Sequence, residues 1–140
     1  MEAEIAPPEG FSRHYRRSSL TDPWEPLWSR KGGGVVRIGF RAVDAHANGR
    51  GFVHGGMISA LADNAMGLSC AETLGDGASL VTVSLALDFL GSAQPGQWVE
   101  IEPRVNRAGA TLCFAEAMVT ADGASCAKAH ATFRVVKRTG

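Results

Sequence analysis

The chain has 140 residues, 45% of them hydrophobic, which is enough for the core of one globular domain. Lys and Arg number 14, and Asp and Glu also number 14, so the formal net charge is zero. This composition excludes a wholly disordered chain, and the charge balance gives no general attraction to nucleic acid or to an anionic membrane.

The cysteines and the N-terminal segment indicate the compartment. Cys70, Cys113 and Cys126 are an odd number without Cys-x-x-Cys spacing, which argues against a disulfide framework or a zinc ribbon. The N-terminus lacks the basic residues and apolar run of a secretory signal, and no segment reaches the roughly 18 apolar residues of a membrane span. His46 and His54 do not match metal-ligand spacing. We expect a cytoplasmic protein with no metal, no other cofactor, no membrane contact and no nucleic-acid partner.

Residues 1–33 differ in character from the rest of the chain. They are polar and rich in proline, yet they contain Trp24, Leu27 and Trp28, which disordered leaders seldom carry. We expect an N-terminal extension with a short capping element, followed by one domain over residues 34–140. The two tryptophans either anchor the extension on that domain or line a ligand pocket.

The predicted domain begins with a strand and a long helix. The segment VVRIGFRAVD from Val35 is rich in β-formers, and a glycine-rich loop, AHANGRGFVHGG, follows it. Apolar residues then recur at helical spacing from Met57 to Leu68, and Gly75 is a typical C-terminal stop. Small residues occupy the remaining face, so we expect this helix to be buried on most sides.

Four further strands are predicted after the helix. They correspond to LVTVSLALDFL from Leu80, WVEIEPRV from Trp98, TLCFAEAMVT from Thr111 and SCAKAHATFRVV from Ser125. The short turns between them indicate antiparallel pairing. In the first of these strands, simple alternation places Val81 and Leu85 on one face and Thr82 on the other. These elements predict an α+β fold in which one curved antiparallel sheet wraps around one central helix.

An acid lies inside this apolar helix. An unpaired buried carboxylate at Asp63 would cost several kcal/mol or shift its pKa. Either Asp63 reaches solvent or pairs with a neighbour such as Asn64, or it is a general base or nucleophile held by partial burial.

The helix begins with His54-Gly55-Gly56, which leaves backbone N–H groups free at the positive end of the helix dipole. Such donors stabilise an oxyanion and glycine permits close approach, although the glycines could also serve only the turn into the helix. Asp63 lies eight residues beyond Gly55, about 12 Å along the axis. One small carbonyl cannot contact both, so the catalytic hypothesis predicts a homodimer with composite sites at its interface.

The segment NGRGFVHGGMISALADNAMG from Asn48 resembles the hotdog-fold acyl-CoA thioesterases of the phenylacetate-pathway type, and the similarity continues through LVTVSLALDFLGSAQPG to the end of the chain. The resemblance implies a hotdog fold and hydrolysis of an acyl-CoA to a free acid and CoA. It implies that the Gly55 N–H polarises the thioester carbonyl and that Asp63 activates water or attacks directly. Thr82 would help to hold the water or the carboxylate, while Asn48 and His54 shape the site. In that family the Asn and Gly come from one subunit, the acid and hydroxyl come from the other, and two dimers usually form a tetramer.

These assignments have structural alternatives. Asn48 could instead form the turn at Asn48-Gly49, His54 could only brace the helix start, and Thr82 is an ordinary strand residue. We expect substrate contacts from Gly56, Met57, Asn64, Val83 and Arg134. From residue 101 on, basic residues outnumber acidic ones six to three, and they either hold CoA phosphates or are solvated; they are Arg104, Arg107, Lys128, Arg134, Lys137 and Arg138.

Two other functions stay open. A hotdog dehydratase or hydratase would need two titratable groups, and Asn48 cannot titrate. A non-catalytic acyl-CoA-binding module would need no carboxylate at the reaction centre, so Asp63 argues against it. The sequence also leaves open the size of the acyl group, whether Asp63 or water attacks, and whether the assembly is a dimer or a tetramer.

Overall fold

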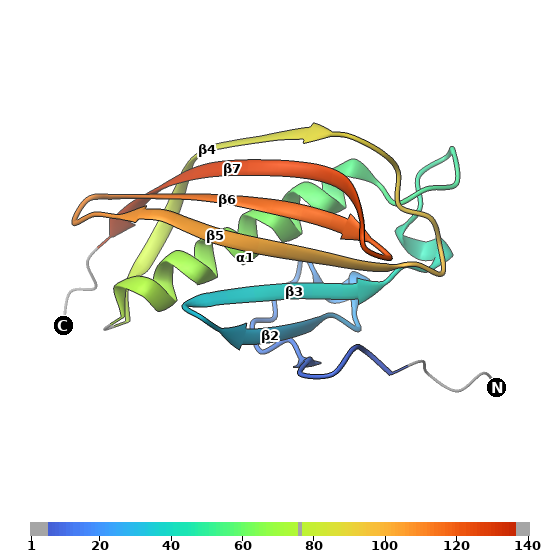
Figure 1. The fold of residues 1–140 in the computed structure, drawn as a ribbon, viewed down its shortest axis with the longest axis horizontal. Coiled ribbons are helices and arrows are strands. Elements are labelled where there is room, and N and C mark those ends of the chain that lie inside the picture. Colours follow the sequence, from blue (N-terminus) through green and yellow to red (C-terminus); the bar gives the residue numbers. More distant parts are fainter. Residues whose placement is uncertain (1–5, 76, 137–140) are drawn as a thin grey trace.

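The computed structural model describes residues 6–75 and 77–136, and Figure 1 shows a curved antiparallel sheet wrapped around one long helix. The strand order is β1-β2-β3-β5-β6-β7-β4. The elements are β1 (Ser12–Arg13), the 3-10 helix η1 (Asp22–Trp24), β2 (Trp28–Gly32), β3 (Val35–Arg41), η2 (Asp44–His46), α1 (Gly55–Leu74), β4 (Ser79–Phe89), β5 (Trp98–Ala108), β6 (Leu112–Ala121) and β7 (Ala124–Val136). The predicted α+β hotdog architecture is confirmed. Residues 1–5 of the predicted extension and 137–140 of the predicted domain lie outside the described residues.

Helix α1 is buried against the concave face of the sheet. It ends at Leu74 and is capped by Gly75, whose φ of 68° suits glycine and whose N–H donates to the Ala71 carbonyl at 2.9 Å. Eight of its residues are buried: Met57, Ile58, Leu61, Ala62, Ala65, Met66, Ser69 and Cys70. The buried residues of the sheet face this helix, so the core lies between helix and sheet, as the small and apolar residues of the helix predicted.

Two thiols meet inside this core. Cys70 of α1 and Cys113 of β6 are both fully buried and neighbour one another. Burial, followed by the neighbouring Cys113, raises the pKa of the Cys70 thiol. Burial also raises the pKa of Cys126. The thiols of Cys70 and Cys126 therefore stay protonated and pack as apolar groups.

Strand β2 was not predicted from the sequence. Its residues, WSRKG, lack the β-branched pattern of a strand. It forms because Gly33 and Gly34, with φ of 63° and 80°, make a tight turn that lays the segment antiparallel against β3, pairing Gly32 with Val35. The sheet thus extends into the N-terminal part of the chain, where β1 pairs with β2.

Strand β4 departs from the predicted alternation. A bulge between Thr82 and Ser84 shifts its register against β7, so Thr82 pairs with the buried Phe133 while Leu85 pairs with the buried Ala131. Thr82 and Leu85 therefore share the face that looks toward α1. The prediction that they lie on opposite faces was wrong, because strict alternation holds only without a bulge.

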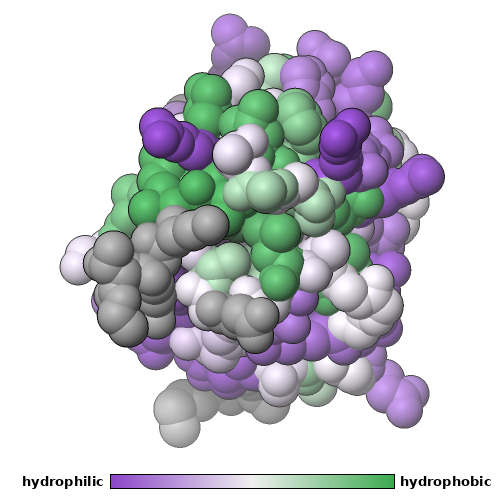
Figure 2. All heavy atoms as spheres, turned by 90° about the vertical axis from the view of Figure 1, so that its left-hand side faces the viewer, coloured by the Kyte–Doolittle hydropathy of each residue, from purple (hydrophilic) through white to green (hydrophobic). Residues whose placement is uncertain are grey.

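Strand β4 is also an exposed edge of the sheet. It pairs with β7 on one side only, and its apolar residues Val81, Val83, Leu85 and Phe89 are exposed, Val83 by 62%. Figure 2 shows the end of the molecule at the left of Figure 1, where apolar side chains gather in the upper part, on the side of β4. A long apolar edge strand with unpaired backbone groups is a surface suited to pairing with another strand.

No helix in the described part of the chain is both long enough and apolar enough to cross a bilayer.

Candidate active site

The N-terminus of α1 presents a free backbone donor. The imidazole Nδ1 of His54 accepts the N–H of Gly56 at 2.8 Å and so caps the helix. The N–H of Gly55, at the first helical position, has no intrahelical acceptor, and no hydrogen bond found within residues 6–75 and 77–136 uses it. It is therefore available to an oxyanion at the positive end of the helix dipole.

Space explains the two glycines at this helix start. A Cβ on Gly56 would lie 2.9 Å from the His54 imidazole, so a side chain there would displace the cap. A Cβ on Gly55 would lie 3.1 Å from the ring of Phe89, a contact that a small shift of the ring would relieve. Phe89, at the end of β4, is thus a neighbour of the free donor.

Asp63 and Thr82 are brought together by the bulge in β4. The Thr82 hydroxyl donates to Asp63 Oδ1 at 2.7 Å. Both residues line a cavity of about 210 Å³ that Asn64 and Gly67 of α1 also border, with Arg16 on the N-terminal side. The hydroxyl fixes the orientation of the carboxylate and leaves lone pairs on both oxygens for a water molecule or a carbonyl carbon.

The free donor and the carboxylate lie in separate parts of the chain's surface. His54, Gly56 and Met57 line a second cavity of about 430 Å³, and no described residue borders both this cavity and that of Asp63. Along α1 the two groups are about 12 Å apart at 1.5 Å per residue. Within one chain they cannot act on the same bond.

Asn48 shapes the loop that leads to His54. Its side-chain oxygen accepts the N–H of Arg50 at 2.9 Å and that of Phe52 at 3.4 Å, and its own N–H donates to the Phe52 carbonyl at 2.8 Å. These bonds form an Asx-type turn. The side-chain oxygen is therefore engaged within the loop.

The candidate substrate contacts fall in different places. Gly56 and Met57 line the cavity beside His54, and Asn64 lines the cavity of Asp63. Val83 is the exposed bulge residue on β4. Arg134 is exposed on the outer face of β7, opposite Val81 and Leu112, and lines neither cavity.

A larger hollow, about 600 Å³, lies on the outer face of the sheet. Its bases include Arg104 and Lys128, but acids face them: the Arg104–Glu116 and Lys128–Asp88 pairs are each 3.9 Å apart. Because acids balance these bases, the hollow does not favour phosphate binding. Lys137 and Arg138, the last two predicted basic residues, lie outside the described residues.

The sequence analysis did not assign Arg16, Leu20 or Phe89 to a site, and it left open whether Trp24 anchors the extension or lines a ligand pocket. Arg16 borders the Asp63 cavity, and Leu20 and Trp24 border the cavity beside His54. Trp24, an aromatic residue in a polar segment, was the one sequence signal for a pocket in this region. The positions of Arg16, Leu20 and Phe89 depend on how distant segments pack.

His46 connects three segments by hydrogen bonds and lines the cavity beside His54. Its Nδ1 accepts the Val43 N–H at 3.2 Å, so its proton lies on Nε2, which donates to the Trp24 carbonyl at 3.1 Å. The His54 N–H donates to the His46 carbonyl at 3.0 Å. Burial lowers the pKa of His46, and the bond to Trp24 offsets this only in part, so the ring is neutral near pH 7.

We expect the free energy of unfolding to fall as the pH drops below about 6.5. Burial lowers the pKa of both His46 and His14 in the folded chain, so the unfolded state binds more protons in that range. This contribution to stability is fully present above the pKa that the two histidines have in the unfolded chain. It is lost as the pH falls toward their lower pKa values in the folded chain. Urea unfolding at pH 7.5 and at pH 5.5 measures this change. The control variant His130→Gln, at an exposed position, is expected to show the same change in the free energy of unfolding as wild type. Equal free energies at both pH values would contradict it.

Among the residues that the structure describes, no group of three or more His, Cys, Asp or Glu is placed to hold a metal ion.

The family model described as "Thioesterase superfamily" matches residues 50–127, which contain His54, Gly55, Asp63 and Thr82. A Pseudomonas aeruginosa protein named "Putative esterase" is 34% identical over 91% of this chain and 96% of its own length. The human protein acyl-coenzyme A thioesterase 13 is 32% identical over 62% of this chain and 61% of its own length.

A solved structure from Ralstonia eutropha is similar over most of the fold. It is described as a "putative thioesterase, phenylacetic acid degradation-related protein", with 31% identity, a TM-score of 0.75, and coverage of 86% of this chain and 92% of that one. The resemblance stated from the sequence is confirmed by these comparisons.

Proposed function

Because this chain belongs to the thioesterase superfamily, we propose that it hydrolyses acyl-CoA thioesters to the free acid and CoA. The observation that carries the proposal is that Asp63, which accepts the Thr82 hydroxyl of β4 at 2.7 Å, lies on the helix whose first N–H, that of Gly55, is unused within the described residues. The name of the human relative, an acyl-coenzyme A thioesterase, supports CoA as the thiol.

In the proposed reaction the thioester oxygen accepts the Gly55 N–H, which stabilises the negative charge that develops on it. The Asp63 carboxylate removes a proton from water, whose oxygen bonds to the carbonyl carbon. In the alternative route the carboxylate itself bonds to that carbon, departure of the thiolate leaves a mixed anhydride, and water then cleaves the anhydride. The C–S bond breaks, and the CoA thiolate leaves and takes up a proton. Thr82 holds the carboxylate in place in either route.

The proposed site is completed by a second copy of the chain. The distance between Gly55 and Asp63 along α1 requires that the carbonyl held by one subunit meets the carboxylate of the other. The open, apolar edge of β4 supports pairing of the two subunits through this strand. We propose further that two dimers associate, which the exposed Leu112, Phe114 and Met118 on the outer face of β6 support.

We expect Val83→Lys to separate the two subunits that share each site, which lowers the mass of the assembly and abolishes most of the activity. Lysine on an edge strand prevents pairing with another strand, and Val83 is exposed, so the monomer should fold. Light scattering measures the mass, and Ser125→Lys, at an exposed position on β7, is the matched control. An intact, fully active dimer in Val83→Lys would exclude β4 from the interface.

The proposed cytoplasmic location rests on the three cysteines, which are buried as free thiols.

Release of CoA from a panel of acyl-CoAs tests the proposed function. The panel runs from acetyl-CoA to palmitoyl-CoA and includes aromatic thioesters, and the expected result is turnover of at least one of them. Binding without release would favour the non-catalytic module. Addition of water to an enoyl-CoA, or its removal from a 3-hydroxyacyl-CoA, would favour the hydratase or dehydratase.

A further inference from the structure

The cavity beside the free Gly55 donor has a wall that comes from the N-terminal segment. Leu20 and Trp24 form this wall, and Met57 and Ala60 of α1 line the cavity together with Ala45 and Ala47. These six side chains are apolar. The polar lining is His54, Gly56 and the neutral His46, whose nitrogens are used in hydrogen bonds.

We propose that this cavity is the acyl pocket and that Trp24 and Leu20 limit the length of the acyl chain. The inference rests on the proposed thioesterase function and names the part of the substrate that this site selects. His54 and Gly56 flank Gly55, so a carbonyl bound to the Gly55 N–H has one of its two substituents at the mouth of this cavity.

Charge decides which substituent enters. No Lys, Arg, Asp or Glu of the described chain lines the cavity, so nothing there would pair with the phosphates of CoA. An alkyl or aryl group gains free energy by leaving water for apolar walls, without polar groups to satisfy. The volume, about 430 Å³, is within the range of pockets that hold small organic ligands.

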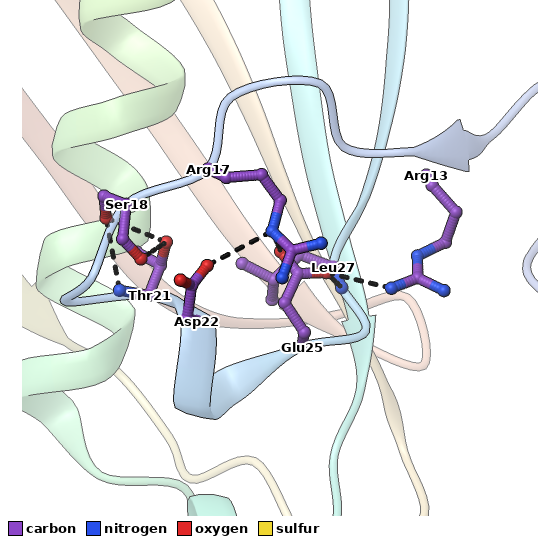
Figure 3. Close-up of polar contacts among 7 residues, drawn as sticks. All are labelled: Arg13, Arg17, Ser18, Thr21, Asp22, Glu25 and Leu27. Carbon is purple, nitrogen blue, oxygen red and sulfur yellow. Dashed lines mark hydrogen bonds and ion pairs between the residues drawn. The ribbon is translucent and has the colours of Figure 1, made fainter.

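Polar contacts on both sides of Trp24 hold the segment that carries this wall, as Figure 3 shows. Glu25, only 10% exposed, accepts the Leu27 N–H at 2.8 Å and pairs with Arg13 at 3.3 Å. Arg17 pairs with Asp22 at 3.1 Å. These contacts hold the segment on both sides of Trp24, whose carbonyl also accepts from His46.

The turn that carries Leu20 is closed by its own hydrogen bonds. The hydroxyls of Ser18 and Thr21 are 3.0 Å apart, the Thr21 N–H donates to the Ser18 hydroxyl at 3.2 Å, and the Asp22 N–H donates to the Ser18 carbonyl at 2.9 Å. Leu20 therefore sits at a defined rim position while remaining 65% exposed. A rim residue of this kind is covered when a long chain fills the cavity, and left exposed by a short one.

The test uses binding, so that it does not depend on turnover. Thioether analogues of acyl-CoA, with alkyl chains of two to sixteen carbons, are titrated by calorimetry into four dimeric proteins: wild type, Trp24→Ala, Ala45→Leu and Trp28→Ala. Trp28→Ala is the matched control. This tryptophan, on β2, packs against Arg13 of β1 and does not line the cavity.

In wild type and Trp28→Ala, the affinity is expected to rise about fourfold per methylene until the cavity is full and then to level off. Ala45→Leu fills part of the cavity and should move the plateau to shorter chains. Trp24→Ala removes the wall, so the plateau should move to longer chains. The affinity for the two-carbon analogue should change little.

The same dependence on chain length in all four proteins would overturn the assignment of the pocket while leaving the proposed function intact. Trp24→Ala that binds the two-carbon analogue like wild type establishes that the site itself is still formed. Absence of binding by wild type for every chain length would overturn both the pocket and the proposed acyl-CoA substrate. Release of CoA in the panel assay together with an unchanged length profile would overturn the pocket alone.

Discussion

Asp63→Asn is expected to lower kcat for acyl-CoA hydrolysis by about 100- to 10,000-fold. The amide keeps the shape of the side chain and can still accept the Thr82 hydroxyl through its oxygen, but it can neither remove a proton from water nor attack a carbonyl. KM should change little, because the carboxylate acts mainly in the transition state. Steady-state release of CoA at saturating substrate measures the effect.

Asp88→Asn is the matched control for this substitution. Asp88 lies on the same strand as Thr82 but on the outer face, opposite Lys128, and its side chain is 73% exposed. Its replacement should leave kcat within about twofold, since exposed ion pairs of this kind contribute little. Asp63→Asn with wild-type turnover and an intact dimer would remove Asp63 from the mechanism.

Gly55→Pro is expected to lower kcat by about 100- to 1,000-fold, the effect of losing one oxyanion-hole donor. Proline has no N–H, yet it suits the first helical position, and His54, with φ −62° and ψ 129°, already has the extended backbone that precedes proline. The substitution thus deletes the donor with little cost to the helix. CoA release and circular dichroism measure the two quantities.

Gly55→Ala separates the donor from the space around it. Alanine keeps the N–H but places a Cβ 3.1 Å from the Phe89 ring, as proline also does. If the donor matters, Gly55→Ala should keep much of the activity that Gly55→Pro loses. Equal losses in both variants would mean that crowding by Phe89, and not the missing N–H, causes the defect.

Mixing the two inactive variants tests whether the sites are shared between subunits. In a heterodimer of Gly55→Pro and Asp63→Asn, one site carries both defects and the other carries neither. Random exchange of subunits gives half heterodimers, each with one intact site of two, so about a quarter of wild-type activity should return. No recovery after exchange would place both groups in one chain and contradict the composite site.

Local patterns in the sequence were sufficient for much of the fold. The buried helix and the strands after it follow from spacing and turn residues, and the free helix N-terminus follows from His54 before two glycines. Asp63 could be singled out because a carboxylate in an apolar helix is costly. Each of these inferences needs only neighbours along the chain.

Features that depend on pairing between distant segments could not be predicted. The bulge after Thr82, which turns its hydroxyl toward Asp63, is set by the register against β7 and leaves no local mark. Strand β2 forms through its pairing with β3, although its own residues are poor strand formers. The position of Leu20 beside α1 depends on the whole path of the N-terminal segment.

The buried thiols described above have a practical value for every assay of this protein. Released CoA can be followed with a disulfide dye that reacts with thiolates, and the protein's own three cysteines are shielded from it by burial. The folded enzyme should thus contribute no background colour on the time scale of turnover. A variant whose cysteines react with the dye has a helix that has separated from the sheet. The same assay therefore distinguishes a chemical defect from loss of the native structure.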